Sequence, residues 1–384
     1  MTPFTFNTTP SVRFVPDGLN DLAASVGSLL GQRIVIVTDR GLVATGIPDR
    51  AVQAMTQAGA QVHLFDSVEA DPPEAIIESA TQMMRDVDAT GVIGLGGGSS
   101  LDVAKLAAAL AKSGATLADS YGIGNLAGGR LPLVLIPTTA GTGSEVTPIS
   151  IVTTGENAKM GVVSPVMLPD VALLDPLLTV GLPAHVTAAT GIDAMVHAIE
   201  AYCSASPNNN PVSRTLACEA LRLMGAALET AVAEPDNIAA RSDMLLGSLL
   251  AGQAFANSPV AAVHALAYPI GGRFKVPHGL SNALVLPHVL RFNIQTAPDA
   301  YAQIAPLLFP HLTGAVADVA AAFCDELQAL ALRCGLPARL RDVDIGKDAL
   351  GPMADDAMQQ TRLLVNNPRP VERADAFAIY EAAW

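Results

Sequence analysis

Four side chains in two short blocks have the types and the spacing of a metal site. Asp193 and His197 lie four residues apart in GIDAMVHAIEAY, and His264 and His278 lie in VHALAYPIGGRFKVPHGLSNALVLPHVL. On a helix, a spacing of four places two side chains on one face. One carboxylate and three neutral imidazoles suit a borderline divalent cation such as Fe²⁺ or Zn²⁺. Such a site would carry a net charge near +1, so it could polarise a substrate oxygen and stabilise an alkoxide.

An alternative interpretation of the same residues needs no metal. Asp193 and His197 would then be an ordinary pair on one helix, and His264 and His278 would be packing residues. The remaining histidines receive this interpretation: His63, His185, His288 and His311. The four candidate ligands differ from them because compatible residue types fall in two compact blocks of a chain that has only seven histidines.

A glycine-rich turn in the first half of the chain has the character of a phosphate-binding loop. Gly96, Gly97, Gly98 and Ser99 follow a strand-like run and precede the helical pattern LDVAKLAAALAKS. Glycines let backbone N–H groups approach a phosphate, and the start of the next helix favours an anion. The turn matches neither G-x-G-x-x-G nor a P-loop. A tight turn without a ligand is the alternative.

Other residues of the first half are candidates for nucleotide contacts. Asp39 ends the first strand-like run, where its carboxylate could accept from a ribose diol and repel a 2′-phosphate; it could equally cap a helix or a turn. Thr138, Thr139 and Thr142 in PTTAGTGSE could donate to phosphate or ribose oxygens, unless this is an ordinary loop. Lys159 could neutralise a pyrophosphate or hold a ribose, or it could be a surface lysine.

The elements that must position these residues change character near Asp175. Before it, strand patterns over residues 33–39, 61–66, 91–96 and 131–137 alternate with helical patterns over 48–58, 74–86 and 101–113. This alternation predicts a Rossmann-like α/β domain with a parallel sheet covered by helices on both faces. After the turn-rich DPLLTVGLP the pattern is helical almost to Trp384. We therefore predict a dinucleotide-binding α/β domain over residues 1–181 and an all-α metal-binding domain over residues 182–384.

Helix breakers divide the second histidine block. Pro269, Gly271, Gly272 and Pro277 lie between His264 and His278. They predict two short helices joined by a turn, with one candidate ligand on each.

Composition narrows the classes of partner. The chain has 384 residues, of which 50% are hydrophobic and 15% charged, and its formal net charge is −14. The absence of any Lys/Arg-rich run argues against nucleic acid or an anionic membrane as partner. The four cysteines have no C-x-x-C spacing. Without a visible signal peptide or membrane-length apolar run, these features predict a cytoplasmic protein.

Taken together, the blocks resemble the iron-containing (type III) alcohol dehydrogenase family. The matching stretches occur in the same order over nearly the whole chain: GGGSSLDVAK, PTTAGTGSEVTP, KMGVVSP, GIDAMVHAIEAY, HALAYPIGGRFKVPHGLSNALVLPHV and NNPRPVERADAFAIYEAAW. The resemblance implies an NAD-dependent oxidoreductase, either an alcohol dehydrogenase or a carbonyl reductase. In such an enzyme, hydride passes between a metal-bound alkoxide and the nicotinamide. It also implies an alcohol, aldehyde or ketone substrate, Fe²⁺ more readily than Zn²⁺, and a homodimer or larger homo-oligomer.

The resemblance also assigns residues. The family's catalytic metal ligands fall on Asp193, His197, His264 and His278. Its nucleotide contacts fall on these residues: Asp39, Gly97, Gly98, Ser99, Thr138, Thr139, Thr142 and Lys159. An acid at the position of Asp39 goes with a preference for NAD over NADP in that family.

One position departs from the family pattern and leaves other activities open. Many members carry a further histidine four residues after the third ligand, where this chain has Tyr268. A phenol is a poorer base than an imidazole at neutral pH, which puts the proton route and the usual small-alcohol substrate in doubt. The alternatives are a dehydroquinate-synthase-like or glycerol-dehydrogenase-like enzyme, or a protein without catalytic activity. An enzyme of the dehydroquinate-synthase type would need several Lys and Arg side chains to hold an anionic substrate, and the metal blocks offer only Arg273 and Lys275.

Overall fold

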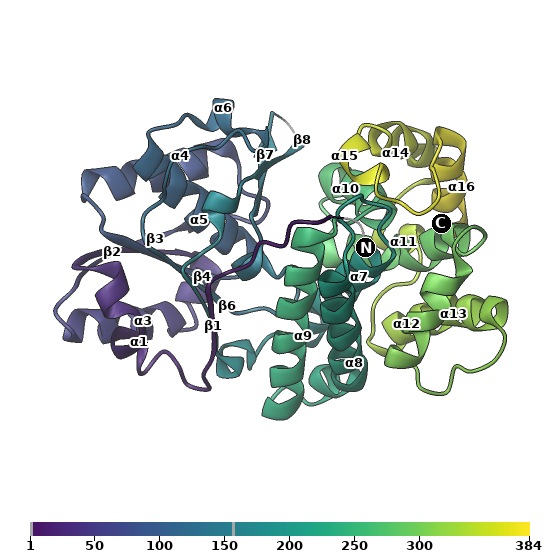
Figure 1. Cartoon of the computed structure of the whole chain (residues 1–384), viewed down its shortest axis with the longest axis horizontal. Coiled ribbons are helices and arrows are strands. Elements are labelled where there is room, and N and C mark those ends of the chain that lie inside the picture. Colours follow the sequence, from purple (N-terminus) through teal and green to yellow (C-terminus); the bar gives the residue numbers. More distant parts are fainter. Residues whose placement is uncertain (1–2, 156–157) are drawn as a thin grey trace. The chain divides into compact units, whose positions relative to one another are not determined.

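The computed structural model describes residues 3–155 and 158–384 of the chain. The chain divides into two compact units, each described here by itself (Figure 1). The α/β unit comprises Asn7–Thr139 and Gly143–Val180. The helical unit comprises residues 3–6, Ala140–Thr142 and Gly181–Trp384. Three residues of the polar loop after residue 139 thus group with the helical unit, although they precede residue 181.

A parallel sheet forms the centre of the α/β unit. Within the described residues it has six strands, in the order β1-β9-β6-β4-β2-β3. Their bounds are Ser11–Phe14 (β1), Arg33–Asp39 (β2), Gln61–Val68 (β3), Gly91–Gly96 (β4), Leu133–Pro137 (β6) and Val171–Leu174 (β9). Every neighbouring pair is parallel. Strands β4 and β6 are buried along their whole length, as expected when helices cover both faces of a parallel sheet.

The alternation of side chains along β2 shows how the two faces are covered. Val35 and Val37 pack into the core formed with helices α4 and α5, whereas Ile34 and Ile36 pack against α1 and α3 on the opposite face. These helices span Leu22–Leu30 (α1), Ile47–Gln57 (α3), Glu74–Asp86 (α4) and Gly98–Ser113 (α5), with the short α2 at Arg40–Val43 and α6 at Leu117–Ser120. The predicted α/β class and the helices on both faces are confirmed.

A second, smaller sheet of the same unit was not predicted. Its strands β7 (Ile149–Thr154) and β8 (Ala158–Val163) form an antiparallel pair, and the two-residue β5 (Gly122–Ile123) joins β8 in parallel. Strands β1 and β9 of the main sheet were also missed. Strands β1, β5 and β9 have four residues or fewer, so their sequence pattern is weak, whereas β7 and β8 have six residues each and were missed although they are as long as β4.

The elements from Ala184 to Ala383 are helical, which confirms the predicted all-α character. The helices are α7 (Ala184–Cys203), α8 (Pro211–Ala233), α9 (Ile238–Asn257), α10 (Ala262–Phe274), α11 (His278–Asn293), α12 (Pro298–Leu308), α13 (Val316–Arg333), α14 (Leu350–Ala357), α15 (Thr361–Leu364) and α16 (Arg373–Ala383). Small residues bring α7 close to its neighbours. A Cβ on Gly191 would lie 2.5 Å from Leu228, and a Cβ on Gly279 would lie 2.4 Å from the Ala189 carbonyl oxygen.

The break between α10 and α11 is shorter than the helix breakers suggest. Pro269, Gly271 and Gly272 lie inside α10, which continues to Phe274. The helix ends at Lys275, whose φ of 58° lies in the left-handed region, and Pro277 immediately precedes α11. The two predicted helices and their turn are therefore confirmed, but the turn consists only of Lys275, Val276 and Pro277.

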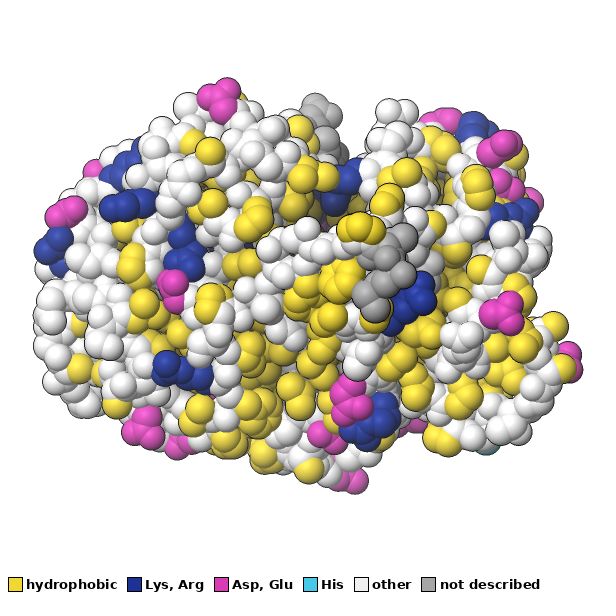
Figure 2. Space-filling model, viewed as in Figure 1, with side chains coloured by type: hydrophobic (Ala, Val, Ile, Leu, Met, Phe, Trp, Pro, Cys, Tyr) yellow, Lys and Arg dark blue, Asp and Glu magenta, His cyan; other side chains and the backbone are white. Residues whose placement is uncertain are grey.

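Two observations concern the distribution of basic side chains and the apolar length of the helices. On the face shown in Figure 2, Lys and Arg side chains are scattered rather than gathered into one basic patch. Among the described residues, no helix combines the length and the apolar character that crossing a membrane requires.

Candidate metal centre and nucleotide loop

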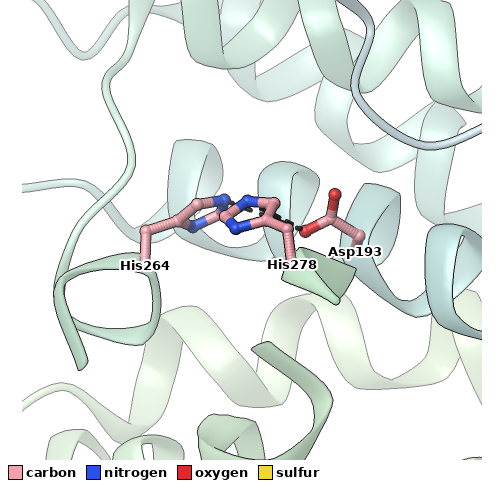
Figure 3. Close-up of side chains that lie close together, drawn as sticks. All are labelled: Asp193, His264 and His278. Carbon is pink, nitrogen blue, oxygen red and sulfur yellow. Dashed lines mark ion pairs between the residues drawn. The ribbon is translucent and has the colours of Figure 1, made fainter. Parts of the chain in front are cut away.

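Three of the predicted ligands converge in the helical unit. Asp193 on α7, His264 on α10 and His278 on α11 each offer a ligand atom, and these atoms all lie within 4.8 Å of one another (Figure 3). Asp193 Oδ1 is 3.7 Å from His278 Nε2 and 4.0 Å from His264 Nε2. Asp193 and His264 are buried, whereas the His278 side chain is 40% exposed. The exposed ligand leaves the group a side open to a small molecule.

His197 joins this group through His264. Its Nε2 atom lies 3.0 Å from His264 Nε2, and its Nδ1 atom lies 3.2 Å from the Gly141 carbonyl oxygen. The Phe255 ring stacks on the imidazole with a centroid separation of 4.3 Å and an interplanar angle of 17°. His197 is thus not one of the three residues whose ligand atoms all lie within 4.8 Å of one another, but it adjoins them through His264 and is held at Nδ1 by Gly141 and on one ring face by Phe255.

The hydrogen-bond partners of two imidazoles determine where their protons lie. A carbonyl oxygen only accepts, so His197 Nδ1 carries the proton toward Gly141. His264 Nδ1 likewise donates to Glu200 Oε2, at 2.7 Å. Both Nε2 atoms then present lone pairs to each other at 3.0 Å, which is repulsive unless a cation lies between them.

A proton on His197 is not that cation, which leaves either a proton on His264 Nε2 donated to His197 or a divalent metal, and the donor set fits the metal. Burial lowers the pKa of His197 to about 3, against the opposing influence of Asp193. The ring is therefore neutral at physiological pH. Two neutral imidazoles with converging lone pairs beside a carboxylate are the ligands that Fe²⁺ and Zn²⁺ accept.

The carboxylate of the site remains ionised although it is buried. Burial raises the pKa of Asp193, but the positive charge that the neighbouring imidazoles carry when protonated, that of His278 most, and a hydrogen bond from Asn282 bring it below its usual range. Asn282 Nδ2 donates to Asp193 Oδ1 at 2.5 Å and lies 3.3 Å from His278 Nε2. Asn282 lies four residues after His278 on α11, so it reaches the site from the same helix face.

Sequence reasoning missed Glu200 and Asn282. Both follow predicted ligands at helical spacings, Glu200 three residues after His197 and Asn282 four residues after His278. The same rule that paired Asp193 with His197 therefore contained the signal for them.

The glycine turn lies at the carboxyl edge of the main sheet. Gly96 ends β4 with a φ of 151°, where glycine is favoured, and Gly97 precedes the first turn of α5, which begins with Gly98 and Ser99. In parallel α/β sheets this edge is where ligands bind. The predicted strand–turn–helix arrangement of a phosphate site is therefore present.

Other nucleotide candidates lie at the same edge. Gly96 pairs with Pro137 in the sheet, and Thr138 N donates to the Gly96 carbonyl oxygen at 3.0 Å, so Thr138 and Thr139 follow β6 beside the glycine turn. Asp39 ends β2; its Oδ1 accepts from Leu42 N at 2.9 Å and its Oδ2 accepts from Ser100 Oγ at 3.4 Å. The helix-capping interpretation of Asp39 is thus correct for one oxygen.

Two candidates lie elsewhere. Lys159 is on β8 of the small sheet, where its ammonium forms an ion pair with Asp71. Thr142 groups with the helical unit, next to the Gly141 carbonyl that accepts from His197.

A buried lysine anchors the loop between β6 and β7, and sequence reasoning missed it. Lys105 Nζ, on α5, donates to Ser144 Oγ at 2.8 Å and Thr147 Oγ1 at 3.1 Å, and pairs with Asp102 at 3.0 Å. Burial lowers its pKa below the ordinary lysine value, although Asp102 and Glu145 oppose this. The ammonium therefore joins the helix after the glycine turn to the loop that carries the threonines.

Comparison with known proteins identifies the family. The model of iron-containing alcohol dehydrogenase matches residues 9–176, and that of the Fe-containing alcohol dehydrogenase family, C-terminal, matches residues 187–384. "Long-chain-alcohol dehydrogenase 1" of Geobacillus thermodenitrificans is 44% identical over 95% of this chain and 93% of its own length. "1,3-propanediol dehydrogenase" of Klebsiella pneumoniae is 36% identical over 98% of this chain and 97% of its own.

A solved structure agrees with these matches. A crystal structure of 1,3-propanediol oxidoreductase superposes with a TM-score of 0.95 at 35% identity and covers 100% of both chains. The matches confirm the predicted fold, the oxidoreductase class acting on alcohols, and the expected cofactors, NAD and a divalent metal. They do not favour the dehydroquinate-synthase-like or glycerol-dehydrogenase-like alternatives, and Arg273 is already paired with Asp356. The chain belongs to the iron-containing alcohol dehydrogenase family.

Proposed function

We propose that Asp193, His197, His264 and His278 bind the divalent metal of an NAD-dependent alcohol dehydrogenase, with Fe²⁺ as the preferred ion. The observation that carries this proposal is the 3.0 Å separation of two imidazole Nε2 atoms whose opposite ring nitrogens are both hydrogen-bonded to acceptors. Such converging lone pairs require a cation. Asp193 supplies the negative charge that a dication needs in a buried site.

The side chains around the ligands support this role. When bound, the metal would supply a Lewis acid for the alcohol oxygen, and NAD would accept the hydride. Phe255 covers one face of His197 and excludes water from it, which strengthens electrostatic interactions at the site. Tyr268 lies with its ring centroid 6.0 Å from that of His278, the exposed ligand, where its phenol can donate a hydrogen bond.

We propose that the cofactor binds at the carboxyl edge of the main sheet. The backbone N–H groups of Gly97, Gly98 and Ser99 at the start of α5 would hold the pyrophosphate. Asp39 would accept from the adenosine ribose, and its charge would disfavour a 2′-phosphate. Other contacts are assigned to Thr138, Thr139, Thr142 and Lys159. Because Lys159 is paired with Asp71, we assign it to a ribose hydroxyl rather than to the pyrophosphate.

The proposed substrates are alcohols and aldehydes with apolar chains. Aromatic rings, Phe255 and Tyr268, lie against two of the imidazoles. The 44% identical relative is named for long-chain alcohols. Each CH₂ that such a surface buries is worth about 0.8 kcal/mol, or up to about fourfold in kcat/KM.

We further propose a cytoplasmic homodimer or larger homo-oligomer. Strand β1 is at the edge of the main sheet, and its Val12 and Phe14 side chains are exposed. An apolar edge strand of this kind is suited to a second copy of the chain. The free cysteines, of which Cys203 and Cys324 are buried thiols, suit a reducing compartment.

One experiment tests the metal site and the activity together. Purified enzyme is assayed with NADH and straight-chain aldehydes of increasing length, and the same sample is analysed for metals. We expect turnover that rises with chain length, and a bound metal that His264→Ala loses together with activity. His311→Ala, at an exposed histidine, is the matched control and should keep both. Full metal occupancy in His264→Ala would exclude His264 as a ligand. Equal kcat/KM for aldehydes of all chain lengths would exclude a preference for substrates with apolar chains.

A further inference from the structure

We infer that Glu200 is a positioning residue that fixes which ring nitrogen of His264 faces the metal. This inference rests on the metal site proposed above. Glu200 lies on α7, three residues after His197 and seven after Asp193, so all three side chains share one helix face. It is 5% exposed, and its carboxylate contacts His264 rather than solvent.

Both carboxylate oxygens of Glu200 are engaged at neighbouring positions of α10. Oε2 accepts from His264 Nδ1 at 2.7 Å, and Oε1 accepts from the Val263 backbone N–H at 2.7 Å. The first N–H groups of a helix have no partner within it, and the N-cap residue Ala261 has no polar side chain to accept from them. Glu200 therefore caps α10 from another helix while holding the ring of the next residue. This double contact fixes the backbone and the imidazole of His264 together.

The carboxylate also contributes to the charge of the site. With neutral imidazoles, Asp193 and Glu200 carry two negative charges within one buried group. A bound divalent cation brings the net charge of the site to zero. With Asp193 as the only carboxylate, the net charge would be +1. Hydrogen bonding to a carboxylate also increases the donor strength of the ligating nitrogen, as in other carboxylate–histidine–metal arrangements. Glu200 should therefore increase affinity for the metal without contacting it.

A glutamine at this position cannot replace both contacts. If its carbonyl oxygen accepts from Val263 N–H, its NH₂ group faces His264 Nδ1 and donates to it. The ring must then carry its proton on Nε2, the atom that faces His197 at 3.0 Å, and cannot coordinate through it. If the amide is reversed, its NH₂ group opposes the Val263 N–H at 2.7 Å. Either orientation disrupts one interaction, although the shape of the side chain is almost unchanged.

The test is the affinity for Zn²⁺, measured by competition with a chelator, in the full-length protein and in Glu200→Gln. We expect Glu200→Gln to bind Zn²⁺ about 10- to 100-fold more weakly, the range found for outer-shell partners. Glu219→Gln, at an exposed glutamate paired with Arg222, is the matched control and should bind as the parent does. The melting temperature of each metal-free protein is recorded as well. A purely structural role of Glu200 would lower that temperature and leave the Zn²⁺ affinity of the folded protein unchanged.

A spectroscopic measurement keeps the inference testable if the variant does not fold. Long-range ¹H–¹⁵N spectra of ¹⁵N-histidine-labelled, Zn²⁺-loaded parent protein report which ring nitrogen of His264 is protonated. We expect the proton on Nδ1 and the metal on Nε2; the reverse would overturn the inference. Unchanged Zn²⁺ affinity in Glu200→Gln would also overturn it while leaving the metal site intact. A parent protein that binds no metal through His264 would instead refute the proposed function.

Discussion

Tyr268 takes the place of a histidine that many members of this family carry, and its ring lies beside the exposed ligand His278. A phenol ordinarily keeps its proton at neutral pH, so it serves as a hydrogen-bond donor rather than as a base. Protons released from the substrate would then leave through water or the ribose hydroxyls. The ring itself would shape the space beside His278.

Tyr268→Phe should therefore keep most of kcat and change the preference among alcohols. Tyr268→Ala should raise KM, because it removes the packing of the ring against His278. Steady-state kinetics with short and long alcohols measure both effects. A loss of about a hundredfold or more in kcat for Tyr268→Phe, the scale of a missing acid–base group, would contradict this role.

Asp39 uses its two oxygens differently, which allows its charge to be tested apart from its structural role. Oδ1 caps the short helix α2 through Leu42 N, and Oδ2 faces Ser100. Asparagine caps a helix as well as aspartate but carries no charge. Asp39→Asn should therefore relax the preference for NADH over NADPH and preserve stability, whereas Asp39→Gly should relax the preference and lose the side-chain cap.

The measurement is the ratio of kcat/KM for the two cofactors, with melting temperatures as the control for folding. If the parent enzyme already uses NADPH as well as NADH, the selectivity assigned to Asp39 is wrong. If neither Asp39→Asn nor Asp39→Gly changes the preference for NADH over NADPH, the role assigned to Asp39 is also wrong.

At the scale of elements, the positions of the ligands depend on how closely the helices approach. Gly279 follows His278 at the start of α11, and a Cβ there would lie 2.4 Å from the Ala189 carbonyl oxygen on α7. Gly279→Ala should push α11 away from α7, and with it His278 away from Asp193. We expect lower thermal stability and weaker metal binding, measured by melting and by chelator competition.

Gly27 on α1 provides the matched control for this prediction. A Cβ at Gly27 meets no atom within 4 Å. Gly27→Ala should therefore leave metal binding unchanged and stabilise the protein by about 0.5–1 kcal/mol, because alanine favours the helix. Equal metal affinity in Gly279→Ala and the parent would show that α11 adapts without moving its ligand.

The elements that the sequence predicts well are those with long, continuous patterns. The buried run RIVIVTD predicts β2 over Arg33–Asp39, and the amphipathic pattern of Glu74–Asp86 predicts α4, both with the observed bounds. Strands such as β9, with four residues, depend on pairing with distant segments and have no distinct pattern. The break between α10 and α11 was predicted, but Pro269, Gly271 and Gly272, which were expected in it, lie inside α10.

Prediction of the site was limited in a different way. Residue types and spacing indicated the four candidate ligands, since few residues combine such donors with helical periodicity. Glu200, Asn282 and Lys105 act through hydrogen bonds to partners far away in the sequence. Helical spacing in the sequence places Glu200 and Asn282 on the faces of the ligands, but their roles depend on burial and on the neighbours that the fold brings together, which the sequence does not show.

At the scale of the whole molecule, a buried acid should make stability depend on pH. Burial raises the pKa of Glu145 to about 7 from 4.5, although its own backbone N–H and Lys105 oppose the shift. The unfolded chain therefore releases this proton at a lower pH than the folded protein does. The free energy of unfolding therefore falls by about 3 kcal/mol as pH rises from about 4.5 to about 7. Below pH 4.5 this loss is absent.

Glu145→Gln removes this charge and should remove the dependence. The gain in unfolding free energy of the variant over the parent should be small near pH 4.5 and larger by up to about 3 kcal/mol at pH 8. Urea unfolding at the two pH values, followed by circular dichroism, measures it. If the unfolding free energies of variant and parent differ by the same amount at both pH values, Glu145 does not cause the pH dependence of stability.

Ala140–Thr142 belong to the helical unit although they lie within the sequence of the α/β unit, and this affects how chimaeras with related enzymes must be built. A chimaera joined near residue 181 would exchange the helices but keep the loop of the other parent. The Gly141 carbonyl that holds His197 would then come from a different protein than the histidine it orients. Functional exchange should therefore require the loop to be transferred with the helices, as a second, separate graft. A chimaera that keeps the hydrogen bond of the candidate metal site therefore needs two junctions in the sequence rather than one.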